Sequence, residues 1–381
     1  MTTFNDWVEK VWRRVYSGSI DNTINLATSI AYTNSTSITL GPTSTTAMRG
    51  NIILAIDYEL MYVTSWNANT GVATVVRGYL GSTAAPHKAG TLCYVQPKYT
   101  RFDIAAALND ELLRLSSPDN GLFQVKTQTI TFNPVYMGYD LGPEIADSFI
   151  DIMEVRYKIP FPTRNYPAIH SWKVLRSIGD TTTFPSGAGI VFYEGGYPGQ
   201  PVYVQYSAPF GSVDYSVTNG SGGLITAGVN EFKAPYTGTF TSADIGKTLG
   251  IPGAGVGGSD FATTITGVIS ATDVITADGI PTAVSNAPFT YAGYSNFDVT
   301  SQTGMTKTML DIPPLGAEIQ LTLPREIKRN FMESQPDPRK APEVPSLAVA
   351  NSVQALTILY NQRVSEEAGR LSRQYTRVEA Y

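Results

Sequence analysis

The sequence predicts an α+β protein that is mainly β, with an antiparallel β-sandwich or barrel as its main domain. Short runs rich in β-branched and aromatic residues recur between Gly and Pro turns, as in QVKTQTITF, DIMEVRYKIPF and QPVYVQYSAPF. Helical spacing of apolar residues is clearest in three stretches, near 3–16, 101–116 and 346–374. These three stretches predict an N-terminal, a central and a long C-terminal helix.

Length and charge limit the class of protein. A chain of 381 residues is long for one hydrophobic core, so we expect two or three domains. Charged residues make up 15% of the chain, which favours a protein that buries surface against partners. The net charge of −5 provides no basic surface, so we expect no sequence-specific nucleic-acid binding. We also expect no membrane contact and synthesis in the cytoplasm, because the sequence shows neither a long apolar span nor a secretory signal.

The first predicted helix, near 3–16, has capping-box spacing between Thr3 and Asp6. Its apolar stripe consists of Phe4, Val8, Val11 and Val15. Trp7 and Trp12 lie off this stripe. Because Trp is common at protein interfaces, both are candidate partner-docking residues, with packing in the core as the alternative.

A change in composition near residue 216 predicts an inserted domain. Charged residues become rare from there to residue 296, while Gly, Ala and Thr dominate. We therefore expect a main β-rich domain at 1–215, an inserted small all-β domain at 216–296, a return to the main domain at 297–335, a proline-rich linker at 336–345 and a C-terminal docking helix at 346–381. The insert is expected to project outward through Gly-rich joints at 220–223 and near Gly293.

The C-terminal helix has two apolar faces. The longer one runs through Val349, Val353, Leu356, Tyr360, Val364, Ala368 and Leu371. The second covers only the first half, through Leu347, Ala350, Ala355, Ile358 and Leu359. A helix of this kind beyond a proline-rich linker predicts docking on another subunit or another protein. Its candidate docking residues are Val349, Val353, Leu356, Tyr360, Val364 and Leu371; packing against its own main domain is the alternative.

Residues 59–91 contain the most informative pattern of the chain. A Glu and a Val lie on one strand, a second strand ends in Arg-Gly, and a loop with Gly and His follows; these positions are Glu59, Val63, Arg77, Gly78, Gly81, Ser82, Ala84, His87 and Gly90. The residues predict a self-bonded loop in which Arg77 pairs with Glu59 and His87 caps a loop carbonyl. A catalytic or ligand-binding His87 is the alternative. This pattern resembles a segment of virion proteins of tailed bacteriophages.

Two further stretches support the resemblance. The run DIPPLGA at 311–317 is similar to one in phage neck proteins, and FTSADIGKTLGIPGAGVGG in the insert resembles β-modules of phage tails and fibres. The resemblance implies a head–tail connector or adaptor in the virion neck, a homo-oligomeric ring of twelve copies that binds the portal protein and the tail or stopper proteins. The alternative is a tail or baseplate protein whose insert binds a host-surface glycan through Tyr215, Tyr236, Tyr291 and Tyr294.

The sequence predicts no enzyme, no cofactor and no metal. Its two histidines, His87 and His170, lie outside any nucleophile elbow, and Cys93 is its only cysteine. The glycine spacing of residues 253–258 matches the dinucleotide-binding fingerprint. Strand-like residues follow it where the fingerprint requires a helix, so we expect a strand-linking loop. Two carboxylates facing each other across a cleft, as in glycoside hydrolases, remain possible on sequence grounds.

Overall fold

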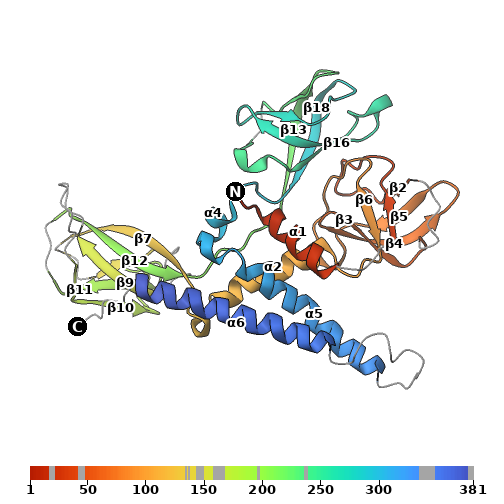
Figure 1. Ribbon diagram of the computed structural model, residues 1–381. Helices are drawn as coiled ribbons and strands as arrows, with labels where there is room; N and C mark the ends of the chain where they lie inside the picture. Colours follow the sequence, from red (N-terminus) through yellow and green to blue (C-terminus); the bar gives the residue numbers. More distant parts are fainter. Residues whose placement is uncertain are drawn as a thin grey trace. The chain divides into compact units, whose positions relative to one another are not determined.

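A computed structural model describes the whole chain except residues 17–21, 42–47, 134, 136–137, 143–149, 158–167, 195–197, 236–238, 334–347 and 376–381. The linker predicted at 336–345 lies outside the described residues. The predicted class is confirmed: the protein is α+β and mainly β, with N-terminal, central and C-terminal helices (Figure 1). The contacts divide the chain into two compact units. Unit 1 comprises Met1–Asn109, Val213–Gln302 and Pro314–Val353; unit 2 comprises Asp110–Ser212, Thr303–Pro313 and Gln354–Tyr381.

Unit 1 contains a six-stranded antiparallel sheet with the order β1-β6-β3-β4-β5-β2. Its strands are β1 (Asn22–Asn25), β2 (Ser37–Thr39), β3 (Ile52–Ile56), β4 (Glu59–Asn67), β5 (Val72–Val76) and β6 (Leu92–Val95). The two outer strands approach each other, because Leu26 after β1 forms a bridge with Leu40 after β2. The sheet therefore encloses an aliphatic core that includes Ile52, Leu54, Ile56, Met61 and Val63.

Helix α1 (Phe4–Val15) belongs to unit 1 and begins with the predicted capping box. The Thr3 amide donates to the Asp6 carboxylate at 2.8 Å, and the Asp6 amide donates to the Thr3 hydroxyl at 3.3 Å. The buried face of the helix consists of Phe4, Trp7, Val8 and Val11.

The stretch predicted as an insert forms a closed barrel in unit 1, ordered β13-β14-β17-β16-β15-β18 (Figure 1). Its strands are β13 (Ser216–Ile225), β14 (Glu231–Lys233), β15 (Thr248–Ile251), β16 (Phe261–Val268), β17 (Asp273–Thr276) and β18 (Val284–Gly293). Three phenylalanine rings, Phe232, Phe240 and Phe289, lie in its core. The expected joints at 220–223 and Gly293 are wrong, because both lie within the paired strands β13 and β18.

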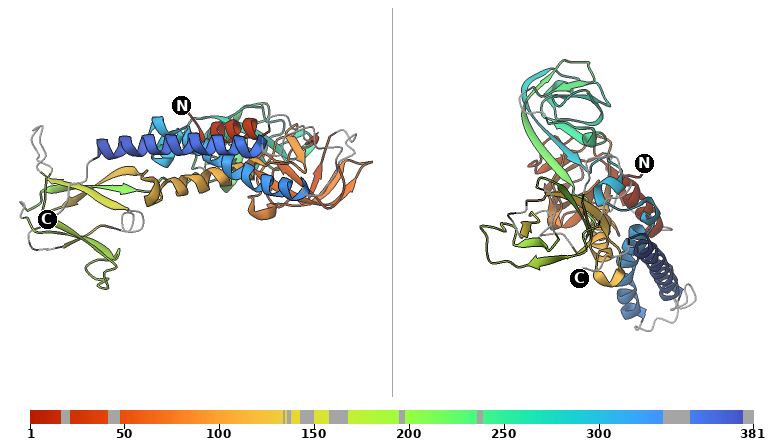
Figure 2. Two further views of the ribbon diagram at one scale, coloured as in Figure 1. Left: turned by 60° about the horizontal axis from the view of Figure 1, so that its bottom comes forward. Right: turned by 90° about the vertical axis from the view of Figure 1, so that its left-hand side faces the viewer.

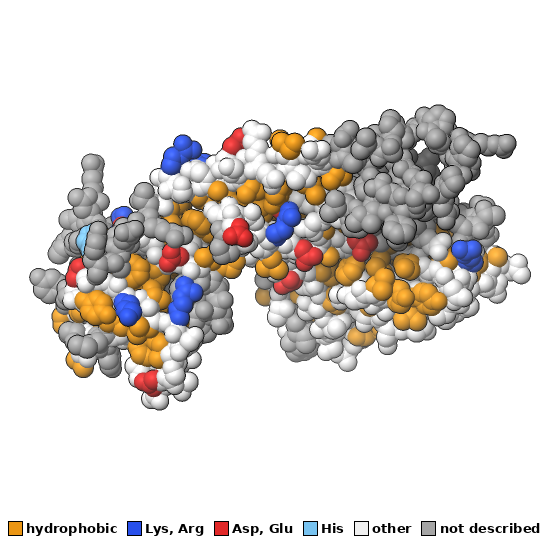
Figure 3. All heavy atoms as spheres, turned by 90° about the horizontal axis from the view of Figure 1, so that it is seen from below, with side chains coloured by type: hydrophobic (Ala, Val, Ile, Leu, Met, Phe, Trp, Pro, Cys, Tyr) orange, Lys and Arg blue, Asp and Glu red, His pale blue; other side chains and the backbone are white. Residues whose placement is uncertain are grey.

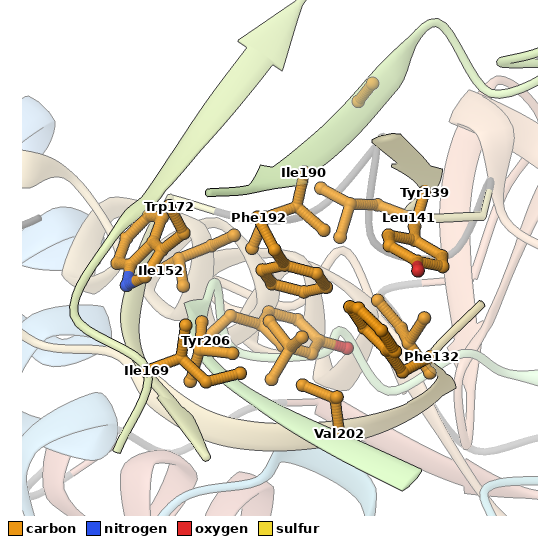
Figure 4. Close-up of a cluster of buried hydrophobic side chains, with 14 of the residues drawn as sticks. Phe132, Tyr139, Leu141, Ile152, Ile169, Trp172, Ile190, Phe192, Val202 and Tyr206 are labelled. Atoms are coloured by element: carbon orange, nitrogen blue, oxygen red, sulfur yellow. The ribbon is translucent and has the colours of Figure 1, made fainter. Parts of the chain in front are cut away.

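Unit 2 contains two three-stranded antiparallel sheets that share one core. One has the order β10-β11-β8, with β8 (Gly138–Asp140), β10 (Trp172–Arg176) and β11 (Ala188–Phe192). The other has the order β7-β12-β9, with β7 (Gln124–Thr131), β9 (Asp151–Tyr157) and β12 (Pro201–Ala208). Figure 4 shows Ile190 and Phe192 of the first sheet facing Val202 and Tyr206 of the second. The arrangement is a small β-sandwich.

The remaining helices are α2 (Arg101–Leu115), α4 (Val299–Thr303), α5 (Ile312–Glu333) and α6 (Ala348–Gln374). Figure 2 shows α6 as one uninterrupted helix. Within the described residues, no helix combines the length and apolar character required to cross a bilayer. The predicted main domain at 1–215 is not one compact unit, since the contacts assign 1–109 to unit 1 and 110–212 to unit 2.

Candidate functional site

The polar residues of the 59–91 pattern gather around one carboxylate, that of Glu59. This residue begins β4 after a tight turn in which Asp57 adopts a left-handed backbone with φ 51°. Arg77 follows the adjacent strand β5, and antiparallel pairing of β4 with β5 brings the two side chains together. The loop after Arg77 returns His87 to the same place.

Glu59 accepts five hydrogen bonds. The Arg77 guanidinium donates two of them, from Nε at 2.6 Å and from Nη2 at 2.7 Å. The backbone amides of Gly78 and Ala85 donate at 3.1 and 3.0 Å, and Nε2 of His87 lies at 2.9 Å. We call Asp57, Glu59, Arg77 and His87 the charge cage.

His87 faces a carboxylate on each side of its ring. Its Nδ1 lies 3.0 Å from Asp57, and its Nε2 faces Glu59. Burial alone lowers the pKa of His87, but hydrogen bonds and charge interactions with Asp57 and Glu59 outweigh it, and the pKa is raised above 6.5. The ring is therefore an imidazolium that donates from both nitrogens.

The Glu59 carboxyl stays ionised although it is buried. Burial alone raises its pKa, yet the hydrogen bonds and charges of Arg77 and His87 lower the pKa from 4.5 to about 2. Two anions and two cations make the charge cage neutral overall, which is the condition for burying charged groups at an acceptable free energy.

The centre of the charge cage is closed to solvent, whereas the Asp57 side chain at its edge is 42% exposed. Glu59 and His87 are each 1% exposed, so neither reaches a substrate or ligand. The predicted Arg77–Glu59 pair is confirmed. The expectation that His87 caps a loop carbonyl is wrong, because its ring nitrogens face carboxylates. The sequence analysis did not identify Asp57 as a member of the cage. The available signal was an Asp between two apolar strands, because Asp tolerates the positive φ of a tight turn.

The loop that the charge cage holds also contacts the barrel within unit 1. Lys88 forms an ion pair with Asp278 at 2.7 Å, and the Ala31 amide donates to Asp260 at 3.2 Å. Gly250 of β15 packs so closely on Ala31 that an added Cβ would lie 2.8 Å from the Ala31 carbonyl oxygen. The barrel therefore packs against loops of the six-stranded sheet within unit 1. This differs from the expected outward projection.

An aromatic cluster holds the two ends of the barrel. Tyr215 precedes β13 and Tyr294 follows β18, and their ring centroids lie 5.2 Å apart. Tyr58 lies 4.7 Å from Tyr294, and Phe4 of α1 lies 4.6 Å from it.

This cluster corrects the predicted glycan platform. Tyr291 and Tyr294 are buried, and Tyr215 packs in the aromatic cluster. Tyr236 lies outside the described residues. These tyrosines therefore do not form an exposed stacking surface for a sugar.

The two tryptophans predicted to dock on a partner are engaged within unit 1. Trp7 is buried in α1, with its ring centroid 6.3 Å from that of Phe4. Trp12 is half-buried; its ring lies 4.8 Å from Tyr16, and the Arg101 guanidinium lies 5.3 Å from its centroid. The prediction of Trp7 as a docking residue is wrong, because its side chain is buried against the start of α1. Docking through Trp12 stays a prediction, although Tyr16 and Arg101 already pack on its ring.

The longer apolar face of α6 is also largely buried. Val353, Tyr360, Val364 and Leu371 are buried and Leu356 is half-buried. The side chain of Val349 lies outside the described residues. The prediction that the four buried side chains dock on a partner is wrong, and the alternative of packing within the chain describes them.

Contacts within unit 2 hold the part of α6 that begins at Gln354. The Arg114 guanidinium of α2 lies 5.1 Å from the Tyr360 ring centroid. Arg363 binds Asp311 through Nε at 2.9 Å and Nη2 at 3.2 Å, and the Thr308 hydroxyl donates to the buried Glu367 at 3.0 Å. Helix α6 is thus held by α2 and by the segment just before α5.

The described residues of the second apolar face of α6 are exposed, whereas the side chains of Leu347 and Ala350 lie outside the described residues. Ile358 is 61% exposed and Leu359 is 44% exposed, with Ala355 exposed beside them. Figure 3 shows hydrophobic side chains along α6 between its charged residues. We call Ala355, Ile358 and Leu359 the α6 surface.

Other candidate chemistry is sparse in the described part of the chain. A groove of about 420 Å³ in unit 2 is lined by Thr127, Met153, Glu154, Arg156, Tyr203, Gln205, Gln374 and Tyr375. Its one carboxylate, Glu154, lies 2.5 Å from Arg156, whereas glycoside hydrolysis requires two carboxylates across a cleft. Among the described residues, no cluster of His, Cys, Asp or Glu could hold a metal ion. The fingerprint-like run at 253–258 leads into strand β16, as expected of a strand-linking loop.

Comparison with known proteins adds little. No family model and no curated protein matches the chain. Among solved structures, the flagellar hook junction protein FlgK from Burkholderia pseudomallei is similar at 11% sequence identity over 97% of this chain and 81% of that chain, with a TM-score of 0.10. A TM-score this low carries no argument about fold or function.

Removing the charge of Glu59 should destabilise unit 1. Glu59→Gln leaves the buried Arg77 and His87 cations without their anion, which we expect to cost about 3–5 kcal/mol of unfolding free energy. Glu231→Gln makes the same chemical change in a partly exposed ion pair with Lys233 and should cost at most about 1 kcal/mol. Denaturant titration followed by tryptophan fluorescence measures both variants, and equal losses would contradict the role of the charge cage.

Stability should also depend on pH through the charge cage. The raised pKa of His87 contributes stability that is complete below pH 6.5 and lost as the pH rises through its folded value. The lowered pKa of Glu59 contributes stability that is complete above pH 4.5 and lost as the pH falls toward about 2. The contribution of the cage is therefore greatest between pH 4.5 and 6.5. In His87→Gln, the alkaline loss measured by thermal denaturation should diminish; an unchanged alkaline limb would refute the assignment.

Gly250→Ala should loosen the docked barrel. The new methyl group would collide with the Ala31 backbone, and overpacking of this kind costs about 1–3 kcal/mol. Gly267→Ala is the control, because its Cβ would meet only Ile275 at an ordinary 3.4 Å. Hydrogen exchange of the Ala31 amide, which donates to Asp260, should accelerate in Gly250→Ala alone. Equal protection in both variants would show that the barrel does not dock through this contact.

Proposed function

We propose that the chain is a structural virion protein of a tailed bacteriophage, a head–tail connector or adaptor that forms a ring in the neck between portal and tail. One observation carries the proposal. The residues of the 59–91 pattern, on which the resemblance to phage virion proteins rests, build a charge cage that secures a loop against the barrel. Its Glu59 and His87 are buried and hold the loop in place, which is a structural use suited to a protein that acts by its shape.

A ring of this kind works through many modest contacts. Closed cyclic symmetry links each subunit to two neighbours, so that no single contact has to be strong. Such a ring would have to resist the pressure of packaged DNA. The rigid inner packing of unit 1 supports this use, because a subunit that deforms easily transmits load poorly.

The α6 surface is the contact we assign to a neighbouring subunit or the portal protein. Its uncovered aliphatic side chains lie on a helix whose other face is already anchored in unit 2. The helix is therefore presented as a preformed ridge, and docking costs little conformational entropy. The alternative of a tail or baseplate protein that binds a host glycan has no specific support, because the tyrosines predicted for that role are buried or packed in the aromatic cluster wherever they are described.

The test combines imaging with a matched pair of variants. Electron microscopy of the purified full chain, alone and with portal protein, should show closed rings. Ile358→Asp with Leu359→Asp should abolish rings without lowering the melting temperature, since both side chains are exposed. Tyr360→Ala should instead lower the melting temperature, since Tyr360 is 5% exposed and its loss leaves a cavity worth about 3 kcal/mol or more. Folded wild-type protein that forms no ring with the portal, and virions that lack the protein, would overturn the proposal.

A further inference from the structure

Strand β7 has an open edge. It is the outermost strand of the β7-β12-β9 sheet, pairing with β12 over eight residues from Gln124 to Thr131. In the described part of the chain, no strand or loop pairs with its other side. The edge has no proline and no bulge, and Lys126 is its only charged residue. Native proteins usually protect or cover edges of this length, since unpaired edges recruit other strands.

The hydrogen-bond pattern identifies the residues that face outward. The Phe132 amide donates to the Gln200 carbonyl at 2.8 Å, so Phe132 bonds toward β12. Antiparallel ladders alternate, and Ile130, Gln128, Lys126 and Gln124 therefore also bond toward β12. The N–H and C=O groups that point away from β12 belong to Val125, Thr127, Thr129 and Thr131. Pro201 stands opposite Thr131, a position where the missing N–H breaks no ladder bond.

A second feature of β7 points to a particular occupant. The Oε1 atom of Gln128, at the middle of the strand, is buried and has no hydrogen-bond partner. A buried amide oxygen without a donor has lost its hydrogen bonds to water without replacement, which is unfavourable. A donor brought to this position by an added strand would remove that cost.

We propose that β7 pairs antiparallel with β7 of a second copy of this chain, about a two-fold axis at Gln128. In this register Thr127 and Thr129 exchange backbone hydrogen bonds with Thr129 and Thr127 of the second copy. The two Gln128 side chains face each other at a non-hydrogen-bonded pair, with Cα atoms about 4.5 Å apart, where each amide nitrogen donates to the other's Oε1. Lys126 lies opposite Ile130 of the second copy, so like charges do not meet.

This pairing is separate from the proposed ring. A two-fold contact uses the same surface on both copies and closes at two, whereas a cyclic ring needs two different surfaces on each subunit. The pairing therefore joins two chains, whether or not these chains also form rings. In this register about seven residues of each strand pair, which is less than a standard interface of about 1,600 Å² provides, so the dimer forms only at high protein concentration.

A disulfide test reads the register directly. Gln128→Cys places two thiols at the axis, and mild oxidation of the full-length protein should give a covalent dimer on a denaturing gel. Lys126→Cys is the matched control, because four residues of offset place its two copies about 14 Å apart, beyond the reach of a disulfide. The wild-type chain, with its single buried Cys93, should stay monomeric on the gel. Equal cross-linking at both positions, or none at 128, would overturn the pairing.

Sedimentation of two further variants tests the edge itself. Thr129→Pro removes an outward N–H while leaving the bonds to β12, so it should keep the dimer from forming at any concentration tested. Thr129→Ala keeps that N–H and should dimerise like the wild type. Unfolding midpoints of both variants should match, which shows that the sandwich is intact. A Thr129→Pro protein that still doubles its mass with concentration would show that β7 is not the contact.

Discussion

Unit 1 is organised around the Glu59 carboxylate. Moving an ionised carboxylate out of water costs many kcal/mol unless compensating groups accompany it. Here a bidentate guanidinium, an imidazolium and two backbone amides surround both oxygens. Each donor comes from a different point on the chain between 77 and 87, so satisfying one side chain also determines the path of that whole loop.

The loop that contains His87 also contacts the barrel. Pro86 and Lys88 flank His87, and each meets the barrel: Pro86 packs against Gly250, and Lys88 pairs with Asp278. The aromatic cluster of Tyr58, Tyr215 and Tyr294 closes the other side, next to the turn that contains Asp57. The barrel is therefore attached to unit 1 through the same turn and loop that build the charge cage, and its orientation within that unit follows from a few buried polar groups.

Much of the fold could be predicted from local signals, and the misses share one physical cause. The capping box of α1, the Arg77–Glu59 pair and the strand content follow from spacing along the chain. Burial of Trp7 and Tyr360 does not, because it requires partners distant in sequence, such as Arg114 for Tyr360. The Asp57 carboxylate reaches His87 from a turn with a left-handed backbone, and sequence spacing alone does not indicate this contact. The sequence of an apolar helix face predicts that the face will be buried, but it does not identify the chain that buries it.

The exposed face of α6 and the open edge of β7 both present groups that lack a partner within the described residues. Within the charge cage, Glu59 and His87 are closed to solvent. The accessible features of interest are the unpaired backbone of β7 and the uncovered aliphatic side chains of Ile358 and Leu359. Both are groups that another polypeptide satisfies better than water does. Measurements of association therefore test both surfaces directly.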